Sequence, residues 1–174
     1  MHLLTTHFLY MKMEKELQIK TAVEADADEL ERIYALSLDS NAPYFPDDME
    51  EEDGDDEREL SFESAIALPD KTVLTLWKDD LLIGGALISL DTYNANIIER
   101  LFILPDEQGK GYGYRAWVEI ERSFPCEGGW KLKTPTCLIN NVCFYVNKCG
   151  FSIIRVEDMG RDGVGMYVFA KAAS

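Results

Sequence analysis

Two kinds of apolar periodicity divide the chain into strands and helices. Alternating or short, β-prone apolar runs predict strands, and apolar residues recurring every three or four positions predict helices. The predicted strands are 17–23, 72–77, 81–90, 96–104, 130–134, 151–157 and 165–171, and the predicted helices are about 26–38, 58–67, 114–124 and 140–149. The pattern predicts an α/β single domain, with a mixed, mostly antiparallel sheet of about seven strands flanked by about four helices.

Local signals predict how some helices begin and which side they bury. Asp26, followed three residues later by Glu29, resembles a capping box at the start of the first helix. Gly150 is expected to end the last helix. The predicted buried face of the third helix consists of Tyr114, Trp117, Val118, Glu121 and Phe124.

Charge excludes one class of partner. The formal net charge of -15 argues against a nucleic-acid partner, because binding to phosphates requires clustered Lys and Arg. Ten acids and one arginine gather in 47–59, so this segment between the first two helices carries most of the charge. It is either a negative rim that attracts a cationic acceptor or an ordinary solvated loop.

Cysteine spacing and hydropathy suggest neither a metal site nor a membrane segment. Cys126, Cys137, Cys143 and Cys149 contain no C-x-x-C pair, so reduced thiols are expected and no metal is. No apolar run approaches 18 residues and no secretory leader is visible, which predicts a cytoplasmic protein with no membrane partner. Residues 1–14 are expected to form an extension, and 15–174 the domain.

The most specific signal is the glycine-rich turn 108–113, Gln-Gly-Lys-Gly-Tyr-Gly, between an apolar strand and a helix. Glycines let a backbone approach a ligand closely, and the first N–H groups of a helix are unpaired donors at a positive dipole end. The turn therefore predicts a ligand that carries a pyrophosphate. Lys110 either pairs with a phosphate or is an ordinary exposed lysine.

The surroundings of the turn exclude other glycine-rich phosphate sites. A dinucleotide fingerprint follows the first strand of a βαβ unit, whereas this turn follows a run of strands. A Walker motif needs Gly-Lys-Ser/Thr, and the kinase companions H-R-D and D-F-G are missing.

Two segments carry a family resemblance. Residues 104–113 resemble the acetyl-CoA signature of the GNAT superfamily of N-acetyltransferases, Q/R-x-x-G-x-G/A, which Gln108, Gly111 and Gly113 fill. Residues 141–151 resemble the helix of that family that ends in F-Y-x-K-x-G-F. The predicted order of elements also matches the GNAT fold.

The resemblance implies acetyl-CoA as the co-substrate. In the family, the strand before the turn splays from the next strand and the pantetheine arm lies between them. Asn140 or Asn141 would contact pantetheine, or would only cap the last helix. The other implied contacts are Phe102, Ile103 and Leu104 with pantetheine, and the N–H groups of Gln108, Gly109, Lys110, Gly111, Tyr112 and Gly113 with the pyrophosphate.

Catalytic roles are implied for two side chains. Tyr145 would be the general acid that protonates the leaving thiolate, and its alternative is a core tyrosine. Glu99, in an apolar strand, would be the base, because a partly desolvated carboxylate takes up a proton readily; its alternative is an exposed strand end. His2 and His7 both fall in the expected extension, so a histidine triad inside the domain is excluded.

The expected activity is transfer of an acetyl group from acetyl-CoA to an amine of a small molecule or peptide, through a ternary complex. The acidic segment favours a cationic acceptor, and the resemblance implies a homodimer. Two alternatives remain open at this point: transfer of another acyl group, and a non-catalytic acyl-CoA-binding regulatory module.

Overall fold

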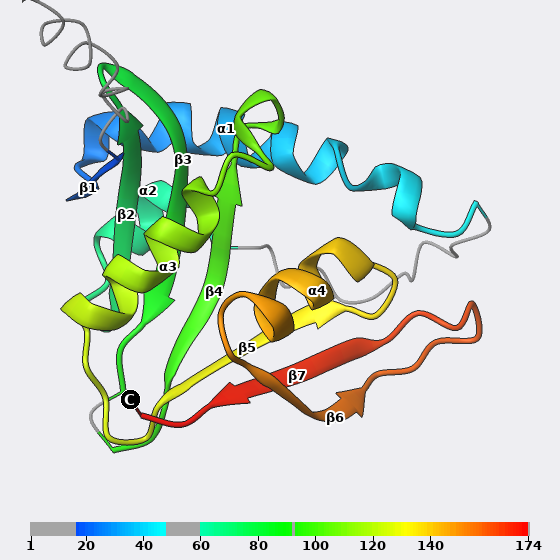
Figure 1. The fold of residues 1–174 in the computed structure, drawn as a ribbon. Helices are drawn as coiled ribbons and strands as arrows, with labels where there is room; N and C mark the ends of the chain where they lie inside the picture. The colour runs from blue at the N-terminus through cyan, green and yellow to red at the C-terminus, as the bar shows by residue number, and fades with distance from the viewer. Residues whose placement is uncertain (1–16, 48–59, 92, 174) are drawn as a thin grey trace, which may run out of the picture.

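The computed structural model describes residues 17–47, 60–91 and 93–173, which form one mixed sheet with helices on both faces (Figure 1). The strands are β1 (Leu17–Thr21), β2 (Lys71–Lys78), β3 (Leu81–Ser89), β4 (Asn96–Ile103), β5 (Trp130–Pro135), β6 (Ser152–Glu157) and β7 (Met166–Lys171). The helices are α1 (Ala27–Asp39), α2 (Phe62–Ile66), α3 (Tyr112–Ser123) and α4 (Ile139–Asn147). Short 3-10 turns are η1 (Glu24–Asp26), η2 (Ala42–Tyr44) and η3 (Pro105–Glu107).

The sheet has the order β1-β2-β3-β4-β5-β7-β6. Within the described ranges, β4 and β5 form the parallel pair, and all other neighbours are antiparallel. The predicted fold class is therefore confirmed, including the mixed sheet of seven strands and the four helices. The extension expected at 1–14 and most of the acidic segment lie outside the described residues.

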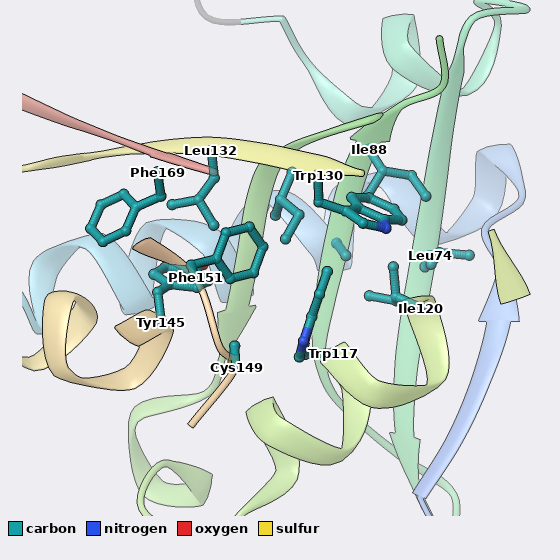
Figure 2. Close-up of a cluster of buried hydrophobic side chains, with 12 residues drawn as sticks. Leu74, Ile88, Trp117, Ile120, Trp130, Leu132, Tyr145, Cys149, Phe151 and Phe169 are labelled. Carbon is teal, nitrogen blue, oxygen red and sulfur yellow. The ribbon is translucent and has the colours of Figure 1, made fainter. Parts of the chain in front are cut away.

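Helices α3 and α4 cover one face of the sheet, in front of the strands in Figure 1. This face holds the larger core cluster, in which Trp117 of α3 meets Trp130 of β5 edge to face, with ring centroids 5.2 Å apart. Phe151 and Phe169 continue the cluster beneath α4 (Figure 2). Such aromatic contacts add to the free energy gained by removing apolar surface from water.

Helices α1 and α2 cover the opposite face. Leu30 and Ile33 of α1 and Phe62 of α2 are fully buried there against β3 and β4. Phe62 also packs on Phe102 of β4, with ring centroids 5.5 Å apart. This second cluster fixes the short helix α2 against the central strands.

The expected face of α3 is partly wrong. Tyr114 and Val118 are exposed, whereas Ala116, Trp117 and Ile120 are buried. Tyr112 begins the helix and packs on β3 and β4, which rotates the buried stripe away from the predicted one. The helical period of α3 was predicted correctly, but its sequence is compatible with more than one buried stripe of apolar residues.

The starts of α1 and α2 differ in detail from the predictions, although Asp26 is the N-cap of α1 as expected. The carboxylate of Asp26 accepts a hydrogen bond from the N–H of Val23 at 2.8 Å and so closes η1, and Glu29 pairs with Arg32 instead of forming a capping box. The predicted helix 58–67 is reduced to α2, where Ser61 is the N-cap and its hydroxyl accepts from the N–H of Ser64.

At the start of α4, Leu138 is the N-cap, so Asn140 and Asn141 both lie inside the helix and neither caps it. Gly150 ends this segment as predicted, with φ of 79°, a left-handed conformation that favours glycine. The N–H of Phe151 then donates to the carbonyl of Tyr145 at 3.0 Å.

Candidate active site

The parallel strands β4 and β5 separate partway along their length. Their pairing ends at Ile98 and Leu132, although β4 continues to Ile103 and β5 to Pro135. β5 pairs with β7 along its whole length, and beyond Ile98 β4 keeps only β3 as a partner among the described residues. We call the gap between the ends of β4 and β5 that no longer pair with each other the wedge. Its edges are strand backbone, which can bind the amides of an extended ligand.

The unpaired edge of β4 offers N–H groups at alternate residues. The N–H of Leu104 donates to the carbonyl of Ile83 on β3 at 2.7 Å, so it points away from the wedge. Because N–H groups alternate in direction along a strand, those of Leu101 and Ile103 point into the wedge. A pantetheine arm in the wedge could therefore bind the backbone N–H groups of Leu101 and Ile103.

The side chains at this end of β4 serve the core. Phe102 is buried against α1 and α2, and Ile103 is buried beneath α3. Leu104 packs at the border of the α1 and α2 cluster. Of these three expected residues, only Ile103 therefore offers a backbone N–H to a ligand in the wedge, because the N–H groups of Phe102 and Leu104 point toward β3.

The glycine turn follows directly after β4 and η3 and leads into α3. Gly109 and Gly111 have φ of 72° and 85°, and a Cβ added to either would meet no atom within 4 Å. Gly111 is the N-cap of α3 in this left-handed conformation. In the described part of the chain, the N–H groups from Gly109 to Tyr114 have no hydrogen-bond acceptor. The turn therefore presents open donors at a positive helix end.

Gln108 has a different place from the one expected. Its N–H donates to the carbonyl of Pro105 at 3.2 Å, so it is not a free donor for a phosphate. Its side-chain amide donates to the carbonyl of Ile103 at 3.0 Å. Gln108 thus ties the turn to the end of β4, and the available donors begin at Gly109.

Charged side chains support the turn from below. Glu107 accepts from Lys78 of β2 at 2.8 Å and from Lys110 at 3.2 Å. The hydrogen bond from Lys78 is the main cause that lowers the pKa of Glu107 from its usual range. Lys110 is half exposed beside the turn and already shares a carboxylate. Tyr112 is buried on the sheet, with Lys78 over its ring at 5.5 Å.

Glu99 lies where the regular register of β4 is interrupted. Leu87 of β3 pairs with Arg100, and the next residue, Ile88, pairs with Ile98, so Glu99 is the extra residue of a β-bulge. Bulges redirect side chains and occur often beside active sites. This one lies immediately after the last pair between β4 and β5.

The surroundings of Glu99 are more polar than the apolar sequence suggested. Its carboxylate forms an ion pair with Lys71 of β2 and accepts a hydrogen bond from Ser89 of β3. Lys71 also donates to the hydroxyl of Ser89 at 2.6 Å. Glu99 is exposed, so the partly desolvated surroundings that were expected for it are not found. Glu99 is also not at a strand end, since β4 extends four residues beyond it.

On the other side of the wedge, Tyr145 of α4 is a core residue. Tyr145 is 8% exposed, and its ring lies near those of Phe151 and Phe169 (Figure 2). The ring of Phe144 lies 5.0 Å away. Burial raises the pKa of the Tyr145 phenol above its usual range. The neighbouring thiol of Cys149 is buried too, and burial raises its pKa to about 12.

The two asparagines of α4 differ in their surroundings. Asn140 is exposed. The amide of Asn141 donates to the hydroxyl of Thr134 on β5 at 3.3 Å, and Thr134 is buried. Asn141 thus joins α4 to the part of β5 that no longer pairs with β4, at the edge of the wedge.

A hollow of about 320 Å³ lies elsewhere on the described surface. It is lined by Leu17, Ile19, Arg115 and Glu119, between β1 and α3. Because β1 is the strand at the far edge of the sheet, this hollow is separate from the wedge. Among the described residues, no group of three or more His, Cys, Asp and Glu side chains is placed to hold a metal ion. No described helix is long and apolar enough to cross a membrane.

Comparison with known proteins agrees with this geometry. Residues 30–151 match the Acetyltransferase (GNAT) family, which is more than half of the chain. The chain belongs to the GNAT family of acetyltransferases. A curated relative, the uncharacterized protein YrkN of Bacillus subtilis (strain 168), is 28% identical to this acetyltransferase over 136 residues, which cover 70% of this chain and 74% of YrkN.

Solved structures share the fold at low sequence identity. A GNAT-family acetyltransferase from Bacillus cereus ATCC 10987 has a TM-score of 0.62 at 12% identity, covering 90% of this chain and 97% of the other. A putative streptothricin acetyltransferase from Bacillus anthracis str. Ames, in complex with acetyl coenzyme A, has a TM-score of 0.56 at 17% identity, covering 68% and 71%. These likenesses support the fold of this acetyltransferase.

The α4 segment of this GNAT acetyltransferase departs from the family pattern F-Y-x-K-x-G-F by one residue. Counting back from Gly150 and Phe151, Lys148 takes the place of the lysine and Val146 that of the tyrosine. Tyr145 then takes the place of the phenylalanine. The burial agrees with this count, because Val146 is 38% exposed and Tyr145 is in the core. One residue turns a helix by about 100°, so these two side chains point in different directions.

The sequence interpretation also missed Arg100. Two adjacent charged residues, Glu99 and Arg100, are typical of an exposed strand end, yet Arg100 is only 8% exposed. A charged pair inside an apolar strand was the available signal, but the bulge that turns both side chains to one face is not visible in the sequence.

Proposed function

We propose that this acetyltransferase transfers the acetyl group of acetyl-CoA to an amine of a small molecule or peptide, with both substrates bound together. One observation carries the proposal: the wedge between β4 and β5 opens beside a turn whose N–H groups from Gly109 to Tyr114 have no acceptor within the described residues. A strand edge and an anion-binding turn in sequence suit a ligand with an extended amide arm and a pyrophosphate.

The local shape fits acetyl-CoA. The space beside Gly109 and Gly111 is open, so phosphate oxygens can approach the backbone there. The N–H groups of Leu101 and Ile103 and the side chain of Asn141 line the wedge and would bind the pantetheine amides. The acetyl-CoA complex of the putative streptothricin acetyltransferase, which has a related fold, supports this assignment.

Acetyl-CoA supplies an activated thioester, and the protein has to orient the two substrates and manage protons. Holding both in one site converts a bimolecular reaction into a nearly unimolecular one. Wedge-facing N–H groups of β4 would stabilise negative charge on the carbonyl oxygen. Glu99, which forms an ion pair with Lys71, would accept the proton that the attacking amine loses.

The leaving thiolate needs no tyrosine in this scheme. Tyr145 is enclosed by aromatic rings, and Val146 has no proton to donate. We therefore assign Tyr145 to the core and the protonation of the thiolate to water, since a thiol with a reference pKa of about 8.5 makes a tolerable leaving group near neutral pH.

A cationic amine is the acceptor class that the sequence favours. The segment 47–59 concentrates negative charge in the connection between α1 and α2, and α2 packs on β4 near Glu99. An anionic rim raises the local concentration of a cation, and its effect falls as salt screens it. Polyamines, aminoglycosides and lysine-rich peptides are suitable test amines.

The first experiment measures donor binding and turnover separately. We expect CoA and acetyl-CoA to raise the melting temperature, and a panel of spermidine, kanamycin, streptothricin and a lysine-containing peptide to include an amine that releases thiol from acetyl-CoA. Stabilisation without thiol release by any amine would instead favour the non-catalytic binding module. Absence of stabilisation would contradict the proposed donor.

The role of Glu99 has its own test. Glu99→Gln keeps the hydrogen bond with Ser89 and removes the base, so kcat should fall and its decline toward acidic pH should flatten. Glu119→Gln, on the surface of α3, is the matched control. A variant pH–rate profile that parallels the wild type would remove Glu99 from the chemistry.

A further inference from the structure

The buried guanidinium of Arg100 lies between two helices and the central strand. It sits 4.7 Å from the ring centroid of Tyr34 on α1 and 5.0 Å from that of Phe62 on α2. Its Nη2 also donates to the carbonyl of Leu60 at 2.8 Å. With Phe102 of β4 beside both rings, these contacts form an aromatic enclosure around one cation.

The β-bulge explains why Arg100 and Glu99 share one face. Ser89 and Lys71 lie two residues from Leu87 and Val73, which are buried under α1 and α2, so all four face the same helices. Glu99 contacts Ser89 and Lys71, and Arg100 contacts residues of α1 and α2. The bulge thus places the proposed base and the buried cation side by side, where β4 loses its contact with β5.

The contacts of Arg100 converge on the start of α2. Leu60 and Phe62 flank Ser61, the N-cap of that helix. A hydrogen bond from α1 also holds the start of α2, because the carboxylate of Glu31 accepts from the N–H of Phe62 at 2.7 Å. Arg100 therefore links the start of α2 directly to the strand that carries Glu99.

We propose that Arg100 is a positioning residue that fixes the start of α2 beside Glu99 and thereby sets the geometry of the acceptor amine. The inference rests on the proposed function, because it takes Glu99 as the base and the α1 and α2 face as the side from which the amine enters. An acetyl-CoA molecule bound along the turn and α3 makes no use of Arg100.

Arginine is suited to this task in a way that lysine is not. Its planar guanidinium stacks on aromatic faces and donates in a fixed direction at the same time. An ammonium in its place keeps the charge but cannot stack on both rings while reaching the carbonyl of Leu60. Arg100→Lys is therefore the informative variant, and Arg100→Met removes the charge as well.

The test compares the two substrates. In Arg100→Lys we expect KM for the best amine of the panel to rise about fivefold or more, while the Kd of acetyl-CoA by calorimetry stays within about twofold. Amide exchange at Phe62 should become faster in the same variant without ligand, since its N–H bond to Glu31 loses its support. Arg122→Lys, an exposed arginine of α3, is the matched control.

The outcomes separate the possible failures. Unchanged KM and unchanged exchange at Phe62 in Arg100→Lys would overturn the inference, and so would equal weakening of both substrates, which indicates general damage. If the wild type binds acetyl-CoA but releases no thiol with any amine, the proposed activity fails, and with it the acceptor role of Arg100. In that case faster exchange at Phe62 would establish only the anchoring contact.

Discussion

The two sides of the wedge use different parts of the chain. On the β4 side, the proposed ligand contacts are backbone N–H groups, held by a strand register, two left-handed glycines and the start of α3. On the β5 side, the expected contacts are side chains of α4. A backbone contact depends on the local conformation, which glycines indicate in a sequence. A side-chain contact from a helix changes direction when the alignment of the sequence shifts by one residue. The open glycine turn can therefore be expected from the sequence, whereas the direction of a side chain on α4 needs the structure.

The largest expected effect tests the α4 side. Tyr145→Ala should lower the free energy of unfolding by about 3–5 kcal/mol, as for other large buried aromatic residues, because it opens a cavity among Phe151 and Phe169. Urea denaturation measures this. Tyr93→Ala is the control, since Tyr93 is 94% exposed and should change stability by less than about 0.5 kcal/mol. A similarly small loss for Tyr145→Ala would contradict its place in the core.

Most of the fold was predictable because its signals are local. Strand and helix periods, the left-handed Gly150 and the glycine turn each depend on a few neighbouring residues. The errors arose where long-range packing decides. Asp26 is the N-cap of α1, but its carboxylate accepts from Val23 in the preceding turn, and the buried stripe of α3 is set by Tyr112 packing on β3 and β4.

The candidate site was predictable in its location and less so in its details. Gln108 was expected to bind phosphate through its N–H, but that N–H donates to the carbonyl of Pro105 in η3. The surroundings of Glu99 and Arg100 depend on a bulge against β3, and a bulge leaves no mark in the alternation of β4 alone. The expected role of Tyr145 came from aligning the motif on its aromatic pair, whereas counting back from Gly150 places Val146 at the tyrosine position.

The next prediction tests the β4 side. Gly111→Ala should raise the Kd of CoA about tenfold or more, because a methyl group at φ of 85° strains the turn and projects into the open space beside the N–H groups. Calorimetry measures the Kd. Gly163→Ala is a matched control, since Gly163 has φ of 81° and equally open space but lies in the turn between β6 and β7. Equal losses of CoA binding in the two variants would attribute the effect to strain in general.

A smaller effect concerns the support beneath the turn. Glu107→Gln removes the carboxylate that Lys78 and Lys110 share. The pKa of Glu107 is lowered in the folded protein, so its charge stabilises the fold above the unfolded pKa, and this contribution disappears as the pH falls through the folded value.

Melting curves from neutral to acidic pH test this sign. The wild type should melt above Glu107→Gln at pH 7. The gap should begin to close near the unfolded glutamate pKa of about 4.3 and vanish only as the pH falls through the lower folded pKa of Glu107. Glu119→Gln, at a more exposed pair on α3, should differ less from the wild type at pH 7. A gap that persists unchanged at acidic pH would mean that packing of Glu107, and not its charge, supports the turn.

The smallest expected effect is the sharpest test of the comparison. Tyr145→Phe keeps the ring in the core and removes only the hydroxyl, so kcat should stay within about twofold of the wild type, whereas loss of a general acid costs about 10²-fold or more. Thiol release with the best amine of the panel measures kcat, and Tyr93→Phe is the control. A large fall in kcat for Tyr145→Phe alone would return the proton donor to α4, and it would show that side chains as well as backbone groups act on both sides of the wedge.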